Sequence, residues 1–254
     1  MKIYVWISAA ILMAVFSEMN YTYARTEDCQ EIFFRSNQAC RADNYQEAIE
    51  GYNLLIASGC INGHIYYNLG NAYFREGRIG HAVLNYERAR LLIPRDADLN
   101  FNLRYAKDRT QDAIPESGPF INNVLFWIDS FSAGELLWCF SVLNLLFWAV
   151  MLTRLFRRSE WSYYVFLILL VLWLAAGASF GFRWHQVEND KRAVIVQAEV
   201  DVLAGPDSRD TTLFKLHEGA VVHNERQENS WYLISLPDRK RGWIPAKAAE
   251  MVKI

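Results

Sequence analysis

Three stretches of the chain carry almost only apolar residues, and they define its organisation. The first covers residues 3–16, behind a single lysine, and is short for a membrane span. Small residues follow it at Thr22 and Ala24, as signal-peptidase cleavage requires. The pattern therefore predicts a signal peptide over residues 1–24. An uncleaved N-terminal anchor is the alternative.

The second and third apolar runs are long enough to cross a bilayer. At 1.5 Å per residue, each would span a hydrocarbon core of about 30 Å. They predict a membrane region over residues 120–183, with spans at about 135–154 and 163–182. The protein is therefore expected to be a multi-pass membrane protein.

The loop between the two predicted spans fixes their expected orientation. It carries three arginines against one glutamate, namely Arg154, Arg157 and Arg158. Short loops rich in arginine lie on the cytoplasmic side. We therefore expect a hairpin that enters the membrane from outside, with both soluble domains in the periplasm.

The segment before the first span, residues 119–131, has bulky apolar residues and few charges. It predicts a short amphipathic helix that lies along the interface on the outer side of the membrane. Ser132, followed three residues later by Glu135, is typical of a capping box that opens the spanning helix. One continuous helix from about residue 120 is the alternative.

The segment between the signal and the membrane region repeats with a period of 34 residues. The aligned pairs are Asn37 with Asn71, Tyr45 with Ile79, Ala48 with Ala82, and Tyr52 with Tyr86. The better copy has the sequence GHIYYNLGNAYFREGRIGHAVLNYERARLLIPRD, with small residues at Gly70, Ala82 and Ala89 and a proline at its end. Small residues at such spacing let two antiparallel helices approach closely.

This pattern resembles the tetratricopeptide repeat. The resemblance implies an all-α domain over residues 25–114, with repeats at about 29–62 and 63–96 and a capping helix at 97–112. It also implies that extended peptides bind along a concave face made by the first helix of each repeat. The residues then expected to contact a peptide are Asn37, Arg41, Tyr67, Asn68, Asn71, Phe74, Arg75 and Asn102. The asparagines could instead bridge adjacent helices.

The cysteines predict one disulfide. Cys29 opens the first helix of the first repeat and Cys60 follows the second, and antiparallel helices bring these ends together. An exported domain meets an oxidising compartment, so we expect Cys29 and Cys60 to be bonded. Cys139 falls in a predicted span and is expected to act as a small apolar residue.

After the hairpin, short alternating apolar runs are separated by turn residues over residues 191–254. They predict five short strands closed into a small all-β barrel. The segment resembles a bacterial SH3-like (SH3b) domain at Gly205-Pro206, Gly219, Trp231-Tyr232 and Gly242-Trp243-Ile244-Pro245. In that family the domain typically binds cell-wall or protein peptides.

Charge and motifs narrow the function classes. The 26 Lys and Arg residues against 28 Asp and Glu give a net charge of −2, which argues against binding to nucleic acid. No phosphate loop, no serine nucleophile motif and no histidine pair at zinc spacing occurs in the sequence. We therefore expect a protein that is not an enzyme and uses no cofactor or metal.

The order of segments as a whole resembles the BatE family of the Bacteroides aerotolerance (Bat) operon. This resemblance is carried by three segments, GNAYFREGRIGHAVLNYERARLLIPRD, LHEGAVV and SWYLISLPDRKRGWIP. It implies a scaffold that works with envelope proteins, among them von Willebrand factor A-domain Bat proteins, in aerotolerance or envelope integrity. A sensor that binds peptidoglycan, or an accessory to a murein enzyme, is the alternative.

Overall fold

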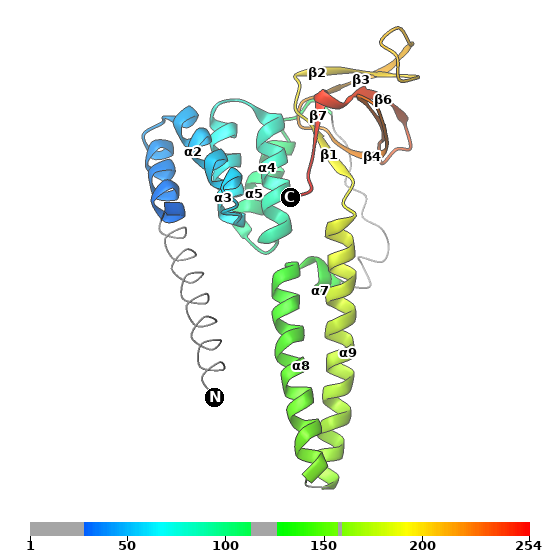
Figure 1. The fold of residues 1–254 in the computed structure, drawn as a ribbon. Helices are drawn as coiled ribbons and strands as arrows, with labels where there is room; N and C mark the ends of the chain where they lie inside the picture. Colours follow the sequence, from blue (N-terminus) through cyan, green and yellow to red (C-terminus); the bar gives the residue numbers. More distant parts are fainter. Residues whose placement is uncertain (1–27, 113–125, 157–158) are drawn as a thin grey trace, which may run out of the picture.

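The computed structural model describes residues 28–112, 126–156 and 159–254 (Figure 1). The predicted signal peptide, the possible N-terminal anchor and most of the segment before the first span lie outside the described residues. The described chain has a helical N-terminal part, a hairpin of two long helices and a C-terminal sheet. Figure 1 shows the N-terminal helices and the sheet side by side at one end of the hairpin.

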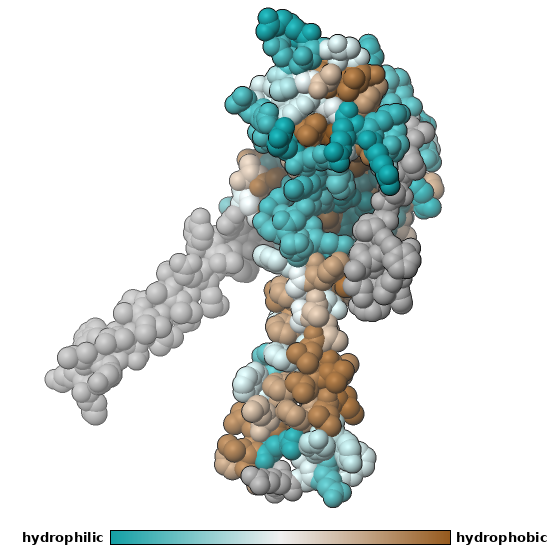
Figure 2. All heavy atoms as spheres, turned by 90° about the vertical axis from the view of Figure 1, so that its right-hand side faces the viewer, coloured by the Kyte–Doolittle hydropathy of each residue, from teal (hydrophilic) through white to brown (hydrophobic). Residues whose placement is uncertain are grey.

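The hairpin consists of α8 (Ala133–Phe156) and α9 (Glu160–Glu188). Both helices are long and apolar enough to cross a membrane. Figure 2 shows hydrophobic residues along this arm and mostly hydrophilic residues over the body above it. The α9 helix continues past the predicted end at residue 182, so its last residues form a polar stalk that leads into the sheet.

A short helix and a cap precede the hairpin. Helix α7 (Phe126–Asp129) ends before α8 begins, so a continuous helix through this point is wrong. The capping box is confirmed: the Glu135 backbone N–H donates to Ser132 Oγ at 3.2 Å, and the Ser132 N–H donates to Glu135 Oε2 at 2.9 Å. Two orphan donors at the start of α8 are thereby satisfied.

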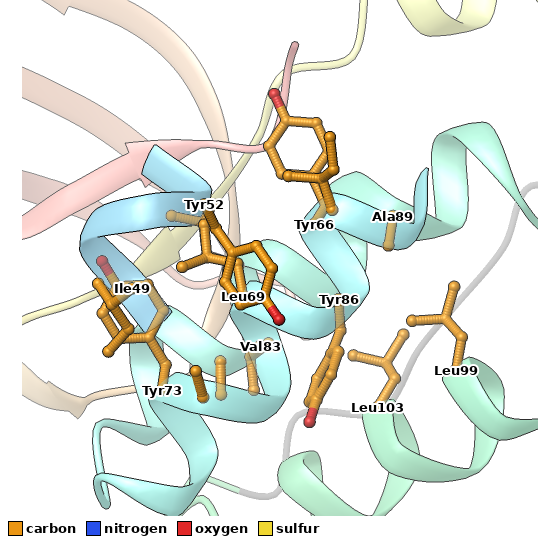
Figure 3. Close-up of a cluster of buried hydrophobic side chains, with 14 of the residues drawn as sticks. Ile49, Tyr52, Tyr66, Leu69, Tyr73, Val83, Tyr86, Ala89, Leu99 and Leu103 are labelled. Carbon is orange, nitrogen blue, oxygen red and sulfur yellow. The ribbon is translucent and has the colours of Figure 1, made fainter. Parts of the chain in front are cut away.

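The helical part follows the 34-residue period. A helix over residues 28–41 pairs with α2 (Tyr45–Ala57), α3 (Gly63–Arg75) pairs with α4 (Ile79–Leu92), and α5 (Ala97–Lys107) packs on α4. Figure 3 shows how Tyr52, Leu69, Tyr86 and Leu103 fill the space between these helices. A Cβ on Gly70 would lie 2.6 Å from the Tyr86 ring, so only glycine allows this approach.

Helix α5 is shorter than the predicted capping helix. Asp96 opens it, because its carboxylate accepts the Leu99 N–H at 2.8 Å. The helix ends at Lys107 rather than at residue 112. The residues that follow turn toward the sheet, where Asp112 Oδ2 accepts the His217 N–H at 2.6 Å and Thr110 packs on Gly219.

The C-terminal part is an antiparallel sheet of seven strands, two more than predicted. The strands are β1 (Arg192–Ile195), β2 (Glu199–Leu203), β3 (Thr212–His217), β4 (Val221–Glu228), β5 (Trp231–Ser235), β6 (Arg241–Pro245) and β7 (Ala249–Met251). Their order is β3-β2-β6-β5-β4-β1-β7. The first alternating run divides in two because β1 pairs with β4 and β7, whereas β2 pairs with β3 and β6.

The sheet and the helices share a hydrophobic core. Side chains alternate along β1, so Ala193 and Ile195 point into the sheet while Val194 points to the helices. Val194 and Val252 are fully buried in the helical core. Gly80 in α4 lies so close to the sheet that a Cβ there would meet the Ile195 carbonyl oxygen at 2.6 Å. The two parts therefore form one packed unit.

A buried carboxylate stands at this junction. Glu87 of α4 is 0% exposed. Its oxygens lie 2.6 Å from Lys107 Nζ, 2.7 Å from Arg90 and 2.8 Å from Arg192 of β1. Burial alone would raise the pKa of Glu87, but these three cations outweigh it and lower the pKa to about 2.

Removing the Glu87 charge should loosen the junction. We expect Glu87→Gln to lower the free energy of unfolding by about 3 kcal/mol or more at pH 7, because it leaves three cations without their buried partner. The contribution of Glu87 is full above its ordinary pKa of 4.5 and is lost as the pH falls toward 2. Thermal unfolding of the full chain in detergent, followed by near-ultraviolet circular dichroism across this range, measures both effects.

The matched control is Glu250→Gln. Glu250 pairs with Arg88 at 3.5 Å across the same junction but is half-exposed, so its loss should cost less than about 1 kcal/mol. Equal losses for the two variants would show that the buried cluster adds nothing to the junction.

The structure joins Cys29 and Cys60 in a disulfide, and Cys40 and Cys139 are free. The bond links residues 31 positions apart and ties the first helix to the end of the first hairpin. In the chain-entropy account, closing a loop of this size stabilises by about 3 kcal/mol.

We expect Cys29→Ser/Cys60→Ser to lower the free energy of unfolding by about 3 kcal/mol. A reductant should lower that of the wild type by the same amount and leave the variant unchanged. Thermal melts with and without reductant measure this. Cys40→Ser is the control, because it should behave as the wild type. A wild type that is insensitive to complete reduction would contradict the expectation.

Candidate functional site

A groove of about 810 Å³ runs along the helical repeats. Seven of the eight predicted contact residues line it: Asn37, Arg41, Asn68, Asn71, Phe74, Arg75 and Asn102. Tyr67 does not line the groove, and its hydroxyl accepts a hydrogen bond from Asn102 Nδ2 at 3.0 Å. The structure thus brings together side chains from the helix over residues 28–41, α3 and α5.

Two asparagine and tyrosine triads form the wall of this groove. Asn37 Oδ1 accepts the Tyr52 hydroxyl at 2.6 Å and the Asn68 amide at 2.9 Å. One period later, Asn71 Oδ1 accepts the Tyr86 hydroxyl at 2.8 Å and the Asn102 amide at 3.0 Å. The repeated hydrogen bonds show that these asparagines do bridge adjacent helices.

The same asparagines keep groups available for a ligand. Among the described residues, no further hydrogen bond uses the Nδ2 of Asn37 or the Oδ1 of Asn68 or Asn102, whereas the Asn71 amide also bonds to the Tyr67 hydroxyl. Each triad therefore offers a carbonyl acceptor beside the groove, and the first triad also offers the amide donor of Asn37. An extended peptide backbone carries the complementary groups whatever its side chains are.

Burial fixes the protonation state of Tyr52 and Tyr86. Desolvation raises the pKa of both Tyr52 and Tyr86 far above the ordinary value of 10. Both hydroxyls therefore stay neutral and donate to Asn37 and Asn71 at any physiological pH. This holds the carbonyl oxygen of each asparagine toward the tyrosine and its Nδ2 away from it.

The groove carries a positive charge. Arg41 and Arg75 line it, and neither forms an ion pair with any residue of the described chain. Asp43 is the acidic residue in the lining, and it accepts a hydrogen bond from the Tyr45 hydroxyl. Two arginines against one aspartate favour a ligand that carries carboxylates.

Sequence reasoning missed an aromatic cluster at one end of the groove. Phe101 and Tyr105 of α5 line it and stack with ring centroids 6.3 Å apart, and Tyr105 also lies 5.6 Å from Phe74. The signal was present, because a further step of 34 residues carries Phe33 and Tyr67 to Phe101. The same step carries Arg75 to Arg109, whose guanidinium lies over the Tyr105 ring at 4.7 Å.

The remaining titratable groups near the groove give no catalytic arrangement. Burial raises the pKa of the Cys40 thiol, although the charge of Arg75 opposes this. A protonated thiol is a poor nucleophile. Within the described ranges, no three His, Cys, Asp or Glu side chains gather as a metal ion would require.

Comparison with protein-family models gives no match, and comparison with curated proteins gives none either.

The triads and the arginines should differ in what their removal does to stability. Tyr52→Phe and Tyr86→Phe should each lower the free energy of unfolding by about 1 kcal/mol, because each removes one buried hydrogen bond of the same kind. Arg75→Ala should change it by less than about 0.5 kcal/mol, because it breaks no ion pair. Thermal unfolding of the full chain measures all three. A comparable loss for Arg75→Ala would assign the arginine a structural role.

Proposed function

We propose that the protein is a non-catalytic, membrane-anchored scaffold that binds protein segments. In this proposal the helical part is a tetratricopeptide repeat domain and the curved sheet is an SH3-like barrel. The two-helix hairpin crosses the inner membrane and holds both domains on its outer side. Partners would be other envelope proteins that present an extended, acidic segment.

The observation that carries this proposal is the groove. Its walls repeat the same asparagine and tyrosine triad one period apart, each triad leaves a carbonyl acceptor available, and the first also leaves the Asn37 amide donor. Arg41 and Arg75 stand beside them without an ion pair in the described chain. Side chains that bind without being needed for folding are the expected mark of a recognition surface.

The proposed membrane placement rests on three independent features. The hairpin helices have the length and hydropathy of spans. The loop between them carries three arginines, which favours the cytoplasmic side. The N-terminal run has the pattern of an export signal. Together they favour an outer location for the groove and the sheet.

The resemblance to the BatE family supplies a context for the partners. It favours an aerotolerance or envelope-integrity complex that includes von Willebrand factor A-domain Bat proteins. The packing of the sheet on the repeats supports a scaffold in particular, because two binding surfaces on one rigid unit hold their ligands at a fixed spacing.

The test is a gentle-detergent purification of the tagged full chain from its native membrane. We expect wild type to recover envelope proteins, and Arg41→Ala/Arg75→Ala to recover them more than about a hundredfold less well, since each lost charge-assisted bond costs on the order of 1.5 to 3 kcal/mol and about 1.4 kcal/mol is a factor of ten. The matched control is Arg35→Ala/Arg104→Ala, which removes two exposed arginines that do not line the groove. This control should recover partners as wild type does.

Two outcomes would contradict the scaffold proposal. If both double variants recovered partners equally poorly, the effect would come from the overall positive charge of the protein and not from the groove. Recovery of murein fragments alone, unchanged by either variant, would move the function to the sheet and favour the peptidoglycan-binding sensor instead.

A further inference from the structure

Asn144 lies at the midpoint of α8. Eleven residues of the helix precede it and twelve follow it, within the 24-residue span from Ala133 to Phe156. At 1.5 Å per residue, the amide is about 17 Å from either end of the helix. The inference below rests on the proposed membrane placement, in which Asn144 would lie close to the middle of the hydrocarbon core.

The side chain of Asn144 lines a hollow on the surface of α8. The hollow measures about 600 Å³, and its other lining residues are Phe140, Ser141, Leu145, Trp148, Ala149 and Leu152. Every lining residue comes from α8 and none from α9. Leu145 is 71% exposed and Trp148 is 52% exposed. The hollow therefore lies on the flank of α8, where Phe140 still packs on Trp173 of α9 with ring centroids 5.9 Å apart, and it opens toward whatever surrounds the hairpin.

No hydrogen bond to Asn144 forms within the described parts of the chain. Its polar neighbours on the helix behave differently: Ser141 Oγ donates to the Leu137 carbonyl and Thr153 Oγ1 to the Val150 carbonyl, both at 2.8 Å. Asn144 thus has two amide donors and an acceptor without an intramolecular partner. In hydrocarbon no water can satisfy them, so a polar group from another helix is needed.

We propose that the hollow around Asn144 is the docking surface for α8 of a second copy of this chain. A carboxamide both donates and accepts, so two identical side chains can satisfy each other. Copies of one chain share one topology, which places both amides at the same membrane depth without further adjustment. A two-fold axis along the membrane normal then pairs each hollow with its equivalent.

Disulfide crosslinking in the membrane tests this proposal on the full chain. All variants carry Cys40→Ser, so that one free thiol remains besides the Cys29 and Cys60 pair. The probe is Leu145→Cys in a Cys139→Ser background, which places the thiol in the hollow. The control keeps the native Cys139, which is exposed on α8 but does not line the hollow.

We expect oxidation to convert the Leu145→Cys protein into dimers and to leave the Cys139 protein largely monomeric. Adding Asn144→Leu, which keeps the side-chain shape, should lower the dimer yield about fivefold or more, as expected for the loss of an interhelical amide contact. Asn144→Gln, which keeps the amide, should retain most of the crosslinking. Resistance to alkaline extraction of the membranes shows that each variant is inserted.

The outcomes separate this proposal from the membrane placement beneath it. Extraction of the wild type by alkali would overturn the membrane-spanning hairpin itself. Three results with an inserted protein would overturn the docking surface. The Leu145→Cys protein could give no dimer, its dimer yield could be unchanged by Asn144→Leu, or the Cys139 protein could crosslink equally well. An Asn144-dependent crosslink to a protein of different mass would replace the second copy with another membrane partner.

Discussion

The buried charge of Glu87 is the constraint on which the relative placement of the parts depends. A carboxylate with no exposed surface is stable only where cations surround it. Here those cations come from α4, α5 and β1, and Arg192 lies 105 positions further along the chain. Asp190 holds the same arginine at 2.6 Å, so the point where the chain leaves α9 and enters the sheet is fixed as well.

Around this cluster, the two soluble parts behave as one body on a polar stalk. The shared core through Val194 and Val252 excludes water from the junction. Arg95 pairs with Glu135 at the start of α8, and Lys253 pairs with Glu188 at the end of α9 at 2.7 Å. The groove therefore keeps a fixed height above the hairpin.

The asparagines that bridge adjacent helices also line the groove. Asn37 and Asn71 use their carbonyl oxygens for the bridges, and the Asn37 amide stays beside the groove. The 34-residue period was enough to locate them, because identical local geometry recurs at each step. It also leads to Phe101, whereas the prediction takes only Asn102 from α5. Tyr67 stands at the same period but does not line the groove.

By itself, the sequence determined the helical hairpins, the two apolar helices, the cap at Ser132 and Glu135, and half of the groove lining. Each of these follows from periodicity or spacing within a few tens of residues, which a single chain displays directly. Only the tertiary structure decided that β1 and β2 are separate strands, that α5 stops at Lys107, and that the sheet packs on α4. These depend on pairing between residues far apart, such as Glu87 with Arg192 and Asp112 with His217. No local pattern marks such pairs, because the sequence around a carboxylate is the same whether folding buries it against distant cations or leaves it on the surface.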